Sequence, residues 1–460
     1  MESPTVQYVS QCFIKPKYTP EESKQPLYLS LWDVMLVIAH YMQRGFVFAK
    51  PPGFDTDGEN QLQELVQKLK ESLSLTLVHF YPLAGRLVTQ KKAENPSELA
   101  IYIDCNKSPG ARFILASLDL TMDDILSTTY VPRILRSLFD HERSINYDGH
   151  TESLLTIQVT ELIDGIFIGC SMNHMVGDGI SLWHFLTSWS EIFKAEEKTS
   201  VISRPPAHDR LFPRGRHNPF LRLPLIYDHD DQVIINRDEA DILPADMIRE
   251  KIFHFSSETV RKLKAKVNAE RNATEISSLQ AVSAHLWRCI TRARNFPSDR
   301  KTSFVMVANA RSKSVPPVPE DYFGNYLRAA IATAGCGELL EHGLGWAAWL
   351  LHQEVINQTG YGISHEQMES WLQSAILSGS DAPDPSRLLL AGSPRFNVYG
   401  IDFGLGIPVA VRTGSADKFD GKMVVSPGVE GGGSMDFEIC LLPHIMTSLE
   451  SDKEFMETVS

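Results

Sequence analysis

The chain has 460 residues, of which 43% are hydrophobic and 22% charged, and its formal net charge is −13 at pH 7. This length suits two packed domains, and this composition is that of an ordinary globular protein. The acidic balance argues against nucleic acid and anionic membranes as partners, although it leaves room for a local basic pocket that takes a phosphorylated cofactor.

The cysteines and the N-terminus indicate a location inside the cell. Six cysteines are scattered without a Cys-x-x-Cys pair or zinc spacing, so we expect reduced thiols and no metal site. The start of the chain lacks a signal-peptide pattern, and no run approaches the roughly 20 apolar residues that span a bilayer. We therefore expect a cytoplasmic monomer with no membrane partner.

The N-terminal part alternates predicted strands and helices. A strand is expected at Val6 to Lys15, and Leu27 to Phe48 contains an apolar, helix-like run. Leucines from 62 to 77 step by three or four residues and predict an amphipathic helix, which Pro82 and Gly85 end. Further strands are predicted at 99–105, 111–116, 154–159 and 166–172, the last two as a hairpin about Asp164-Gly165.

The second part repeats this alternation after an irregular stretch. A helix at 180–194 is followed by 195–250, which is rich in proline and charge and reads as a crossover between two domains. Ser277-Ser278 predicts the cap of a helix over 279–295. Other elements are predicted at 250–255, 258–268, 304–309, 342–352, 366–378, 435–442 and from Pro443 onward.

Strands and helices in two halves predict two α/β domains with mixed sheets. The expected organisation is a first domain at 1–194, a crossover linker at 195–250 and a second domain at 251–460. Arg288, Arg292 and Arg294 gather near the end of one helix, where they complement the helix dipole and face solvent, or alternatively form a phosphate site. The first interpretation is favoured.

The most informative stretch lies at the end of a strand. An apolar run leads to His174, Asp178 follows four residues later, and Gly177 and Gly179 flank that aspartate. The glycines predict a backbone conformation that other residues reach only with strain. A lone histidine in apolar surroundings is usually a core residue, but these neighbours favour a functional imidazole, whose pKa suits a general base near neutrality.

A second motif lies far downstream, at Asp402-Phe-Gly404-Leu405-Gly406. His-x-x-x-Asp-Gly and this motif, in this order, resemble the signatures of the plant BAHD family of acyl-CoA-dependent acyltransferases. The family usually has tryptophan where Leu405 stands. Shorter matches to the family, at Pro82 to Arg86, Asn309-Ala-Arg311 and Tyr322 to Asn325, extend the resemblance over nearly the whole chain.

The resemblance implies a two-domain fold like that of chloramphenicol acetyltransferase, with mixed sheets, flanking helices and an active-site channel at the domain interface. It also implies acyl-CoA as co-substrate and a small-molecule acceptor. In this reading His174 is the general base of a direct ternary reaction, and the site needs no metal. Asp178, with Gly177 and Gly179, is structural and pairs with Arg311.

The remaining site residues are carried over from the family in the same way. Asp402, Gly404 and Gly406 form an architectural loop, which could also be a simple tight turn between strands. Arg395 is the candidate for binding a carboxylated acceptor, and Ser277 and Ser278 are the candidates for contacting the cofactor.

Two other functions stay open at this level. The same pocket could cleave a carboxylated conjugate by a lyase-type elimination without CoA, as in phenolic acid or salicylate metabolism. A catalytically idle binding protein is the other alternative, although the intact His174 and Asp178 argue against it. The chain has no dinucleotide-binding, Walker-type or Gly-x-Ser-x-Gly motif, so nucleotide enzymes and serine hydrolases have little support.

Overall fold

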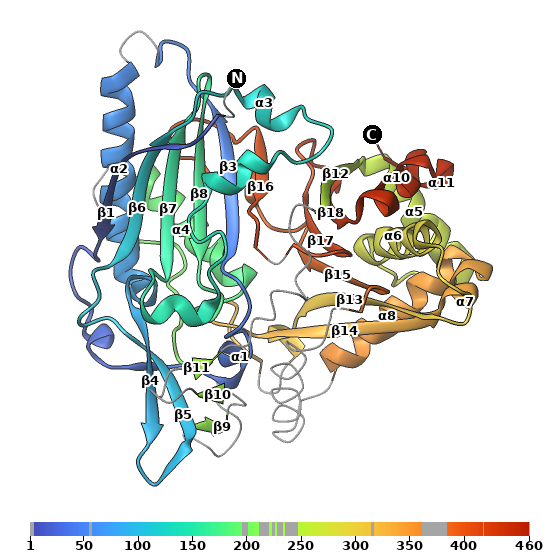
Figure 1. The fold of residues 1–460 in the computed structure, drawn as a ribbon, viewed down its shortest axis with the longest axis horizontal. Coiled ribbons are helices and arrows are strands. Elements are labelled where there is room, and N and C mark those ends of the chain that lie inside the picture. The colour runs from blue at the N-terminus through green and yellow to red at the C-terminus, as the bar shows by residue number, and fades with distance from the viewer. Residues whose placement is uncertain are drawn as a thin grey trace.

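The computed structural model describes residues 4–54, 58–195, 201–210, 220–222, 226–227, 233–234, 247–313, 317–360, 384–416 and 418–459. Within them, two six-stranded sheets lie side by side, each with its own hydrophobic core (Figure 1). The predicted α/β architecture with mixed sheets is confirmed, because each sheet contains both parallel and antiparallel neighbours.

The first sheet has the order β1-β6-β7-β8-β3-β16, and only β6 and β7 run parallel. Helices α2 and α4 pack against each other and share one core with this sheet. The hairpin of β7 and β8 delivers His174 at its end, as the sequence predicts. The bounds are β1 Gln7–Ile14, β3 Met42–Ala49, β6 Ala111–Ser117, β7 Leu155–Glu161, β8 Gly165–Met172, β16 Ala410–Thr413, α2 Gly58–His79 and α4 Gly179–Lys194.

One edge strand of this sheet comes from the C-terminal half of the chain. β16 pairs antiparallel with β3, with Thr413 opposite Arg44 and Ala410 opposite Val47. Figure 1 shows β16 at the side of the first sheet that faces the second sheet. The range 251–460 therefore contributes to both sheets, and the two halves of the chain are interlocked.

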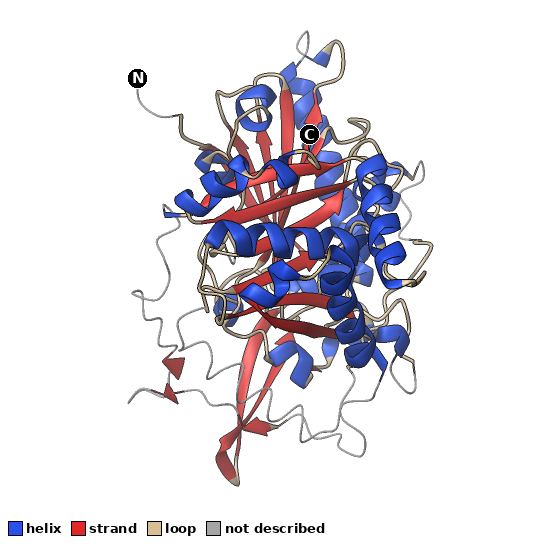
Figure 2. Ribbon diagram, turned by 90° about the vertical axis from the view of Figure 1, so that its right-hand side faces the viewer, coloured by secondary structure: helices blue, strands red, loops and turns tan. Residues whose placement is uncertain are grey.

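The second sheet has the order β12-β18-β17-β15-β13-β14. Its helices gather on the outer side, which faces the viewer in Figure 2, and Trp287 of α6 lies fully buried in their core. The bounds are β12 Arg249–Phe255, β13 Lys301–Asn309, β14 Leu327–Gly335, β15 Arg387–Gly392, β17 Lys422–Pro427, β18 Met435–Leu441, α5 Ser257–Arg271, α6 Ser278–Arg294, α7 Cys336–Glu341, α8 Leu344–Gly360, α10 Pro443–Ser451 and α11 Lys453–Met456.

Smaller elements complete the described part of the chain. The strands β2, β4 and β5 form a separate sheet, to which β9 adds, and β10 pairs with β11. Pro82 lies in a 3-10 helix that ends α2 and leads into β4, as predicted. The bounds are β2 Leu27–Tyr28, β4 Arg86–Lys92, β5 Asn95–Asp104, β9 Leu221–Arg222, β10 Ile226–Tyr227, β11 Val233–Ile234, α1 Leu31–Val34 and α3 Met122–Leu126.

Two predictions are corrected by the structure. The helix-like run at Leu27 to Phe48 is mostly not helical, because beyond the short α1 it forms β3, where Phe46 and Phe48 face one core and Val47 another. The prediction that the arginines at the end of α6 face solvent is wrong for Arg294, which is buried. Arg292 pairs with Asp452 at 2.7 Å, and Arg294 pairs with Asp420 at 2.8 Å. The helix predicted at 366–378 lies outside the described residues.

The two sheets are joined by buried charges as well as by β16. Arg136, from a 3-10 helix beside the first sheet, pairs with Glu250 of β12 at 3.1 Å. Lys418 lies 3.4 Å from the other oxygen of Glu250 and also pairs with Glu438 of β18. The three side chains Lys418, Glu250 and Glu438 are at most 8% exposed, so their charges compensate one another with little help from water.

We predict that Lys418→Met destabilises the protein strongly, because it leaves two buried carboxylates with one cation fewer. Removal of one partner from a buried ion pair typically costs about 3 to 5 kcal/mol. Chemical denaturation measures this loss. The control Lys262→Met removes an ion pair whose side chains are 72% and 62% exposed, and it should cost less than about 1 kcal/mol. Equal losses in the two variants would contradict the prediction.

Candidate active site

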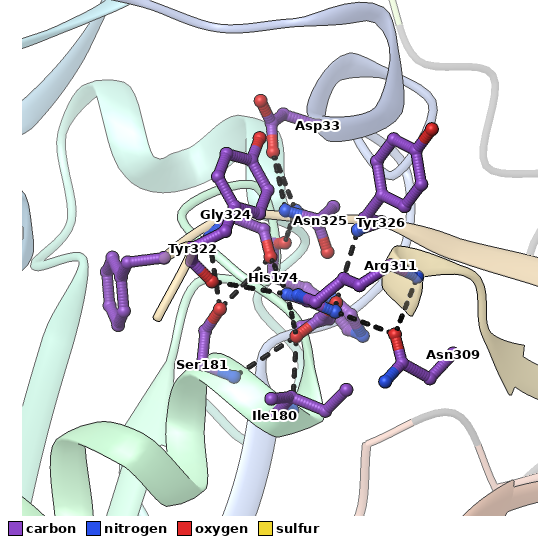
Figure 3. A network of polar contacts seen from close by, with 12 residues as sticks. Asp33, His174, Ile180, Ser181, Asn309, Arg311, Tyr322, Gly324, Asn325 and Tyr326 are labelled. Carbon is purple, nitrogen blue, oxygen red and sulfur yellow. Dashed lines mark hydrogen bonds and ion pairs between the residues drawn. The ribbon is translucent and has the colours of Figure 1, made fainter. Parts of the chain in front are cut away.

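His174 is the first residue of the sharp turn between β8 and α4, and its main chain is held from two sides. Figure 3 shows His174 beside Asn325. Its N–H donates to Oδ1 of Asn146 at 2.7 Å. Its carbonyl accepts a hydrogen bond from Nδ2 of Asn325 at 2.8 Å. The residue is half-buried. The backbone of the candidate base is thus fixed by one residue of the N-terminal half and one of the C-terminal half.

Both asparagines are themselves held by further hydrogen bonds. Asn146 donates through Nδ2 to the carbonyl of Leu36 at 2.7 Å. Asn325 donates to Oδ1 of Asp33 from its backbone at 3.1 Å and from Nδ2 at 2.9 Å. They are 0% and 2% exposed, so their bonds do not compete with bulk water. Neither was singled out as a site residue from the sequence.

Asp178 is fully buried and serves the architecture of the turn. Its Oδ1 caps α4 by accepting the N–H groups of Ile180 and Ser181, each at 3.1 Å. Both carboxylate oxygens accept from Arg311, at 2.7 and 3.0 Å, in a bidentate pair. The N–H of Tyr326 adds a further bond to Oδ2 at 3.1 Å. The Asp178–Arg311 pair predicted from the sequence is present.

The glycines beside Asp178 act differently from the prediction. Gly177 and Gly179 are not among the residues with positive φ, so the expectation of a strained backbone there is wrong. Gly177 is needed for close packing, because a Cβ would lie 2.6 Å from Cβ of Ser181. A Cβ on Gly179 would meet only the ring of Phe396, at 3.7 Å, which is ordinary contact.

A second buried ion pair lies next to the first and was missed by the sequence analysis. Arg210 approaches Asp33 at 3.3 Å, and their side chains are 1% and 0% exposed. Arg210 also donates to the carbonyls of Phe323 and Val176, the latter at 2.8 Å. Asp33 ends the sequence Leu-Trp-Asp near the N-terminus, and Arg210 lies in the proline-rich crossover. Neither local sequence indicates an ion pair, because the two residues meet only in the folded chain.

The turn Tyr322 to Asn325 lies between these two pairs. Arg311 donates to the carbonyl of Gly324 at 2.9 Å, and Ser181 of α4 exchanges hydrogen bonds with the same glycine, both at 3.0 Å. A Cβ at Gly324 would lie 2.1 Å from Nη1 of Arg210, so only glycine fits there. The C-terminal half therefore reaches the His174 turn through this segment.

The loop at Asp402 docks on the other end of the same helix. Ser190 of α4 accepts from the N–H of Asp402 at 3.0 Å and donates to its carbonyl at 2.9 Å. Phe403 is fully buried, with its ring centroid 4.5 Å from that of Trp189. Gly404 and Gly406 have φ of 76° and 83°, which favours glycine. Leu405 is half-buried and packs against the core of the first sheet.

The other candidates lie outside the network of Figure 3. Arg395 is exposed, next to Phe396, whose ring stacks on Trp183 of α4 at 5.6 Å. Ser277 forms a capping box with Gln280, accepting its N–H at 3.3 Å, so its hydroxyl helps to start α6 as predicted. Ser278 is the first residue of that helix and is half-buried.

Other reactive groups in the described part of the chain are poorly suited to chemistry. All six cysteines are free thiols, and burial raises the pKa of the Cys289 and Cys440 thiols to about 12. Burial lowers the pKa of His208 and His285 to about 4, so both are neutral at pH 7. The described residues contain no cluster of His, Cys, Asp or Glu that could hold a metal ion, and none of their helices is suited to crossing a membrane.

The fold and the histidine turn define a two-domain α/β transferase, and a family model described as Transferase family matches residues 5–456. An uncharacterized acetyltransferase of Arabidopsis thaliana is 33% identical over 98% of this chain and 99% of its own length. The BAHD acyltransferase DCR of the same plant is 30% identical over 98% of this chain and 92% of its own. The chain belongs to the BAHD acyltransferase family.

The fold agrees with that of a solved structure. Vinorine synthase superposes with a TM-score of 0.71, covering 99% of each chain at 19% sequence identity. At this identity the likeness concerns the fold alone. It confirms the predicted two-domain arrangement, while the roles of individual residues depend on the contacts described above.

We predict that Asp178→Asn lowers thermal stability together with activity. The change replaces a bidentate carboxylate by an amide and leaves Arg311, which is 2% exposed, without its counter-charge. A loss of about 3 to 5 kcal/mol is expected in chemical denaturation. The exposed Asp119 provides the matched control, since Asp119→Asn should leave stability within about 0.5 kcal/mol. Normal stability with abolished turnover would instead give Asp178 a direct chemical role.

Proposed function

We propose that this protein transfers an acyl group from acyl-CoA to the hydroxyl or amine of a small plant metabolite, with His174 as general base. The observation that carries the proposal is the fixation of the His174 main chain by Asn146 and Asn325 at the start of α4. General bases work best when they are held in one orientation toward the proton that they accept. Family membership supplies the class of reaction.

The proposed reaction is a direct transfer between two bound substrates. The imidazole of His174 accepts the acceptor's proton while the freed oxygen or nitrogen attacks the thioester carbonyl. The tetrahedral adduct then collapses, the carbon–sulfur bond breaks, and the sulfur leaves as CoA thiol with the proton that His174 returns. A covalent acyl-enzyme is not required, and the raised pKa of the Cys289 and Cys440 thiols makes them poor nucleophiles at neutral pH.

Asp178 takes no proton in this scheme. Its oxygens already accept from Arg311, the start of α4 and Tyr326, so it holds the turn in place. Arg395, on the exposed loop before Asp402, is proposed to meet a carboxylated acceptor. Ser277 and Ser278 are proposed to contact the cofactor at the start of α6.

CoA-independent cleavage of a carboxylated conjugate is the second candidate. It is motivated by Leu405, which stands where related proteins usually have tryptophan, and by the exposed guanidinium of Arg395. Such a lyase would use His174 to take a proton from the conjugate rather than from an acceptor. The requirement for acyl-CoA separates the two reactions.

The test is turnover of a panel of phenols, alcohols and amines with several acyl-CoAs, with and without each donor. Wild type should form ester or amide only when acyl-CoA is present. His174→Ala should lower kcat by about two to four orders of magnitude at unchanged melting temperature. The exposed His444 is the matched control, and His444→Ala should retain full activity. Product formation without a donor would favour the lyase, and full activity of His174→Ala would remove this residue from the mechanism.

Asn325→Ala provides a separate prediction about the positioning of His174. The variant loses the Nδ2 bonds to the His174 carbonyl and to Oδ1 of Asp33, which costs about 1 to 3 kcal/mol for buried groups left unpaired, and it keeps the backbone bond to Asp33. We expect kcat to fall about 10-fold or more while KM for either substrate changes little, because the base is displaced rather than the substrates. An unchanged kcat, or a loss confined to KM, would show that the asparagine does not position the base.

A further inference from the structure

Arg44 lies on β3 of the first sheet, between the edge strand β16 and β8, the strand that leads to His174. On β3 it stands opposite Cys170 of β8 and opposite Thr413 of β16. His174 follows Cys170 by four residues, which span at most about 14 Å of extended chain. Figure 1 shows β3, β8 and β16 side by side at the side of the sheet that faces the second sheet.

Among the described residues, the guanidinium of Arg44 lacks the acidic partner that several buried arginines have. Its Nη1 donates a hydrogen bond to the carbonyl of Gln43 at 2.7 Å. Within the described residues, no carboxylate lies within 4.0 Å of it. By contrast, three buried arginines each pair with a carboxylate in the same chain: Arg210 with Asp33, Arg294 with Asp420 and Arg311 with Asp178.

Arg44 is surrounded by protein and is nevertheless accessible. Burial lowers the pKa of its guanidinium to about 10, yet the residue is half-buried rather than sealed. Part of the side chain therefore stays in contact with solvent, where a solute can reach it. A desolvated charge without a counter-charge is costly, so an anion that reaches this part of the side chain would compensate the charge.

Aromatic rings lie beside this position. Phe46, two residues along β3 and on the same face, meets Trp183 of α4 edge to face at 5.8 Å. Trp183 stacks in turn on Phe396 at 5.6 Å. A cation next to an aromatic surface suits a ligand with a flat or apolar body and one negative group.

We propose that Arg44 is an oxyanion-binding residue of the substrate site, which takes a carboxylate of the acceptor or a phosphate of the acyl-CoA. Both groups accept two parallel hydrogen bonds from a guanidinium. The proposal rests on the proposed function for its choice of ligands. The anion would be bound near the His174 turn, from which Cys170 is separated by one short stretch of β8.

The experiment measures equilibrium binding by two pairs of probes, each an anion and a neutral analogue. Coenzyme A is compared with pantetheine, and 4-hydroxybenzoate with its methyl ester. The proteins are wild type, Arg44→Met, Arg44→Lys and the control Arg261→Met, which changes an exposed arginine of α5. Melting temperatures are measured for all four. Because binding needs no turnover, failure of acyl transfer and failure of this proposal are distinguished.

Wild type should prefer the anion in at least one pair. Arg44→Met should lower affinity for that anion about 10- to 100-fold, as loss of hydrogen bonds from a charged donor does, and leave the neutral analogue unchanged. Its melting temperature should be equal or higher, since an unpaired cation is removed. Arg44→Lys should keep part of the preference, and Arg261→Met all of it.

If Arg44→Met loses affinity only for coenzyme A, Arg44 binds a phosphate of the donor. If it loses affinity only for 4-hydroxybenzoate, Arg44 binds an acceptor carboxylate. Each of these results supports the proposal. It is overturned if wild type prefers neither anion, if Arg44→Met binds both anions like wild type, or if Arg44→Met melts several degrees lower and loses affinity for neutral and charged probes alike.

Discussion

The buried ion pair between Asp178 and Arg311 is the constraint on which the rest of the site depends. Asp178 begins α4 in the first half of the chain, and Arg311 follows β13 of the second sheet. Both side chains are at most 2% exposed, so removing either partner would leave a buried charge unpaired and destabilise the fold. The turn that contains His174 is thereby tied to the second half of the chain.

The neighbouring contacts follow from that junction. The segment Tyr322 to Asn325 is held against the His174 turn by Arg311 and Arg210, and this brings Asn325 to the His174 carbonyl. At its other end, α4 receives the Asp402 loop through Ser190 and Phe403. Both family motifs therefore lie against one helix, the first at its start and the second near its end. The first sheet ends in β16, a strand from the C-terminal half. The candidate base is positioned by the assembled chain rather than by its local sequence.

The sequence predicted those parts of this arrangement that depend on local patterns. Hydrophobic periodicity located α2, α4 and the β7–β8 hairpin. The His-x-x-x-Asp-Gly motif selected His174 and Asp178, and a shorter match to the family selected Arg311. Contacts between distant segments had no such signal, so the Asp33–Arg210 pair and the asparagines beside His174 were missed. Gly177 and Gly179 are part of the predicted motif, but the strained backbone expected there is absent. Glycine also occurs where close packing leaves no room for a side chain, as at Gly177, and the sequence does not distinguish that role from a positive φ. The apolar run before Phe48 predicts a helix, whereas the structure has β3 there, because a strand that is buried on both faces is also a continuous apolar run.

The central claim is that the acyl group passes directly from donor to an acceptor activated at His174. Rapid mixing of stoichiometric protein with acyl-CoA, with and without acceptor, tests it by CoA release and by the intact mass of the protein. The account predicts that CoA is released only when acceptor is present and that the mass of the protein does not change. A burst of CoA equal to the protein concentration without acceptor, with one acyl group added to the protein, would contradict it.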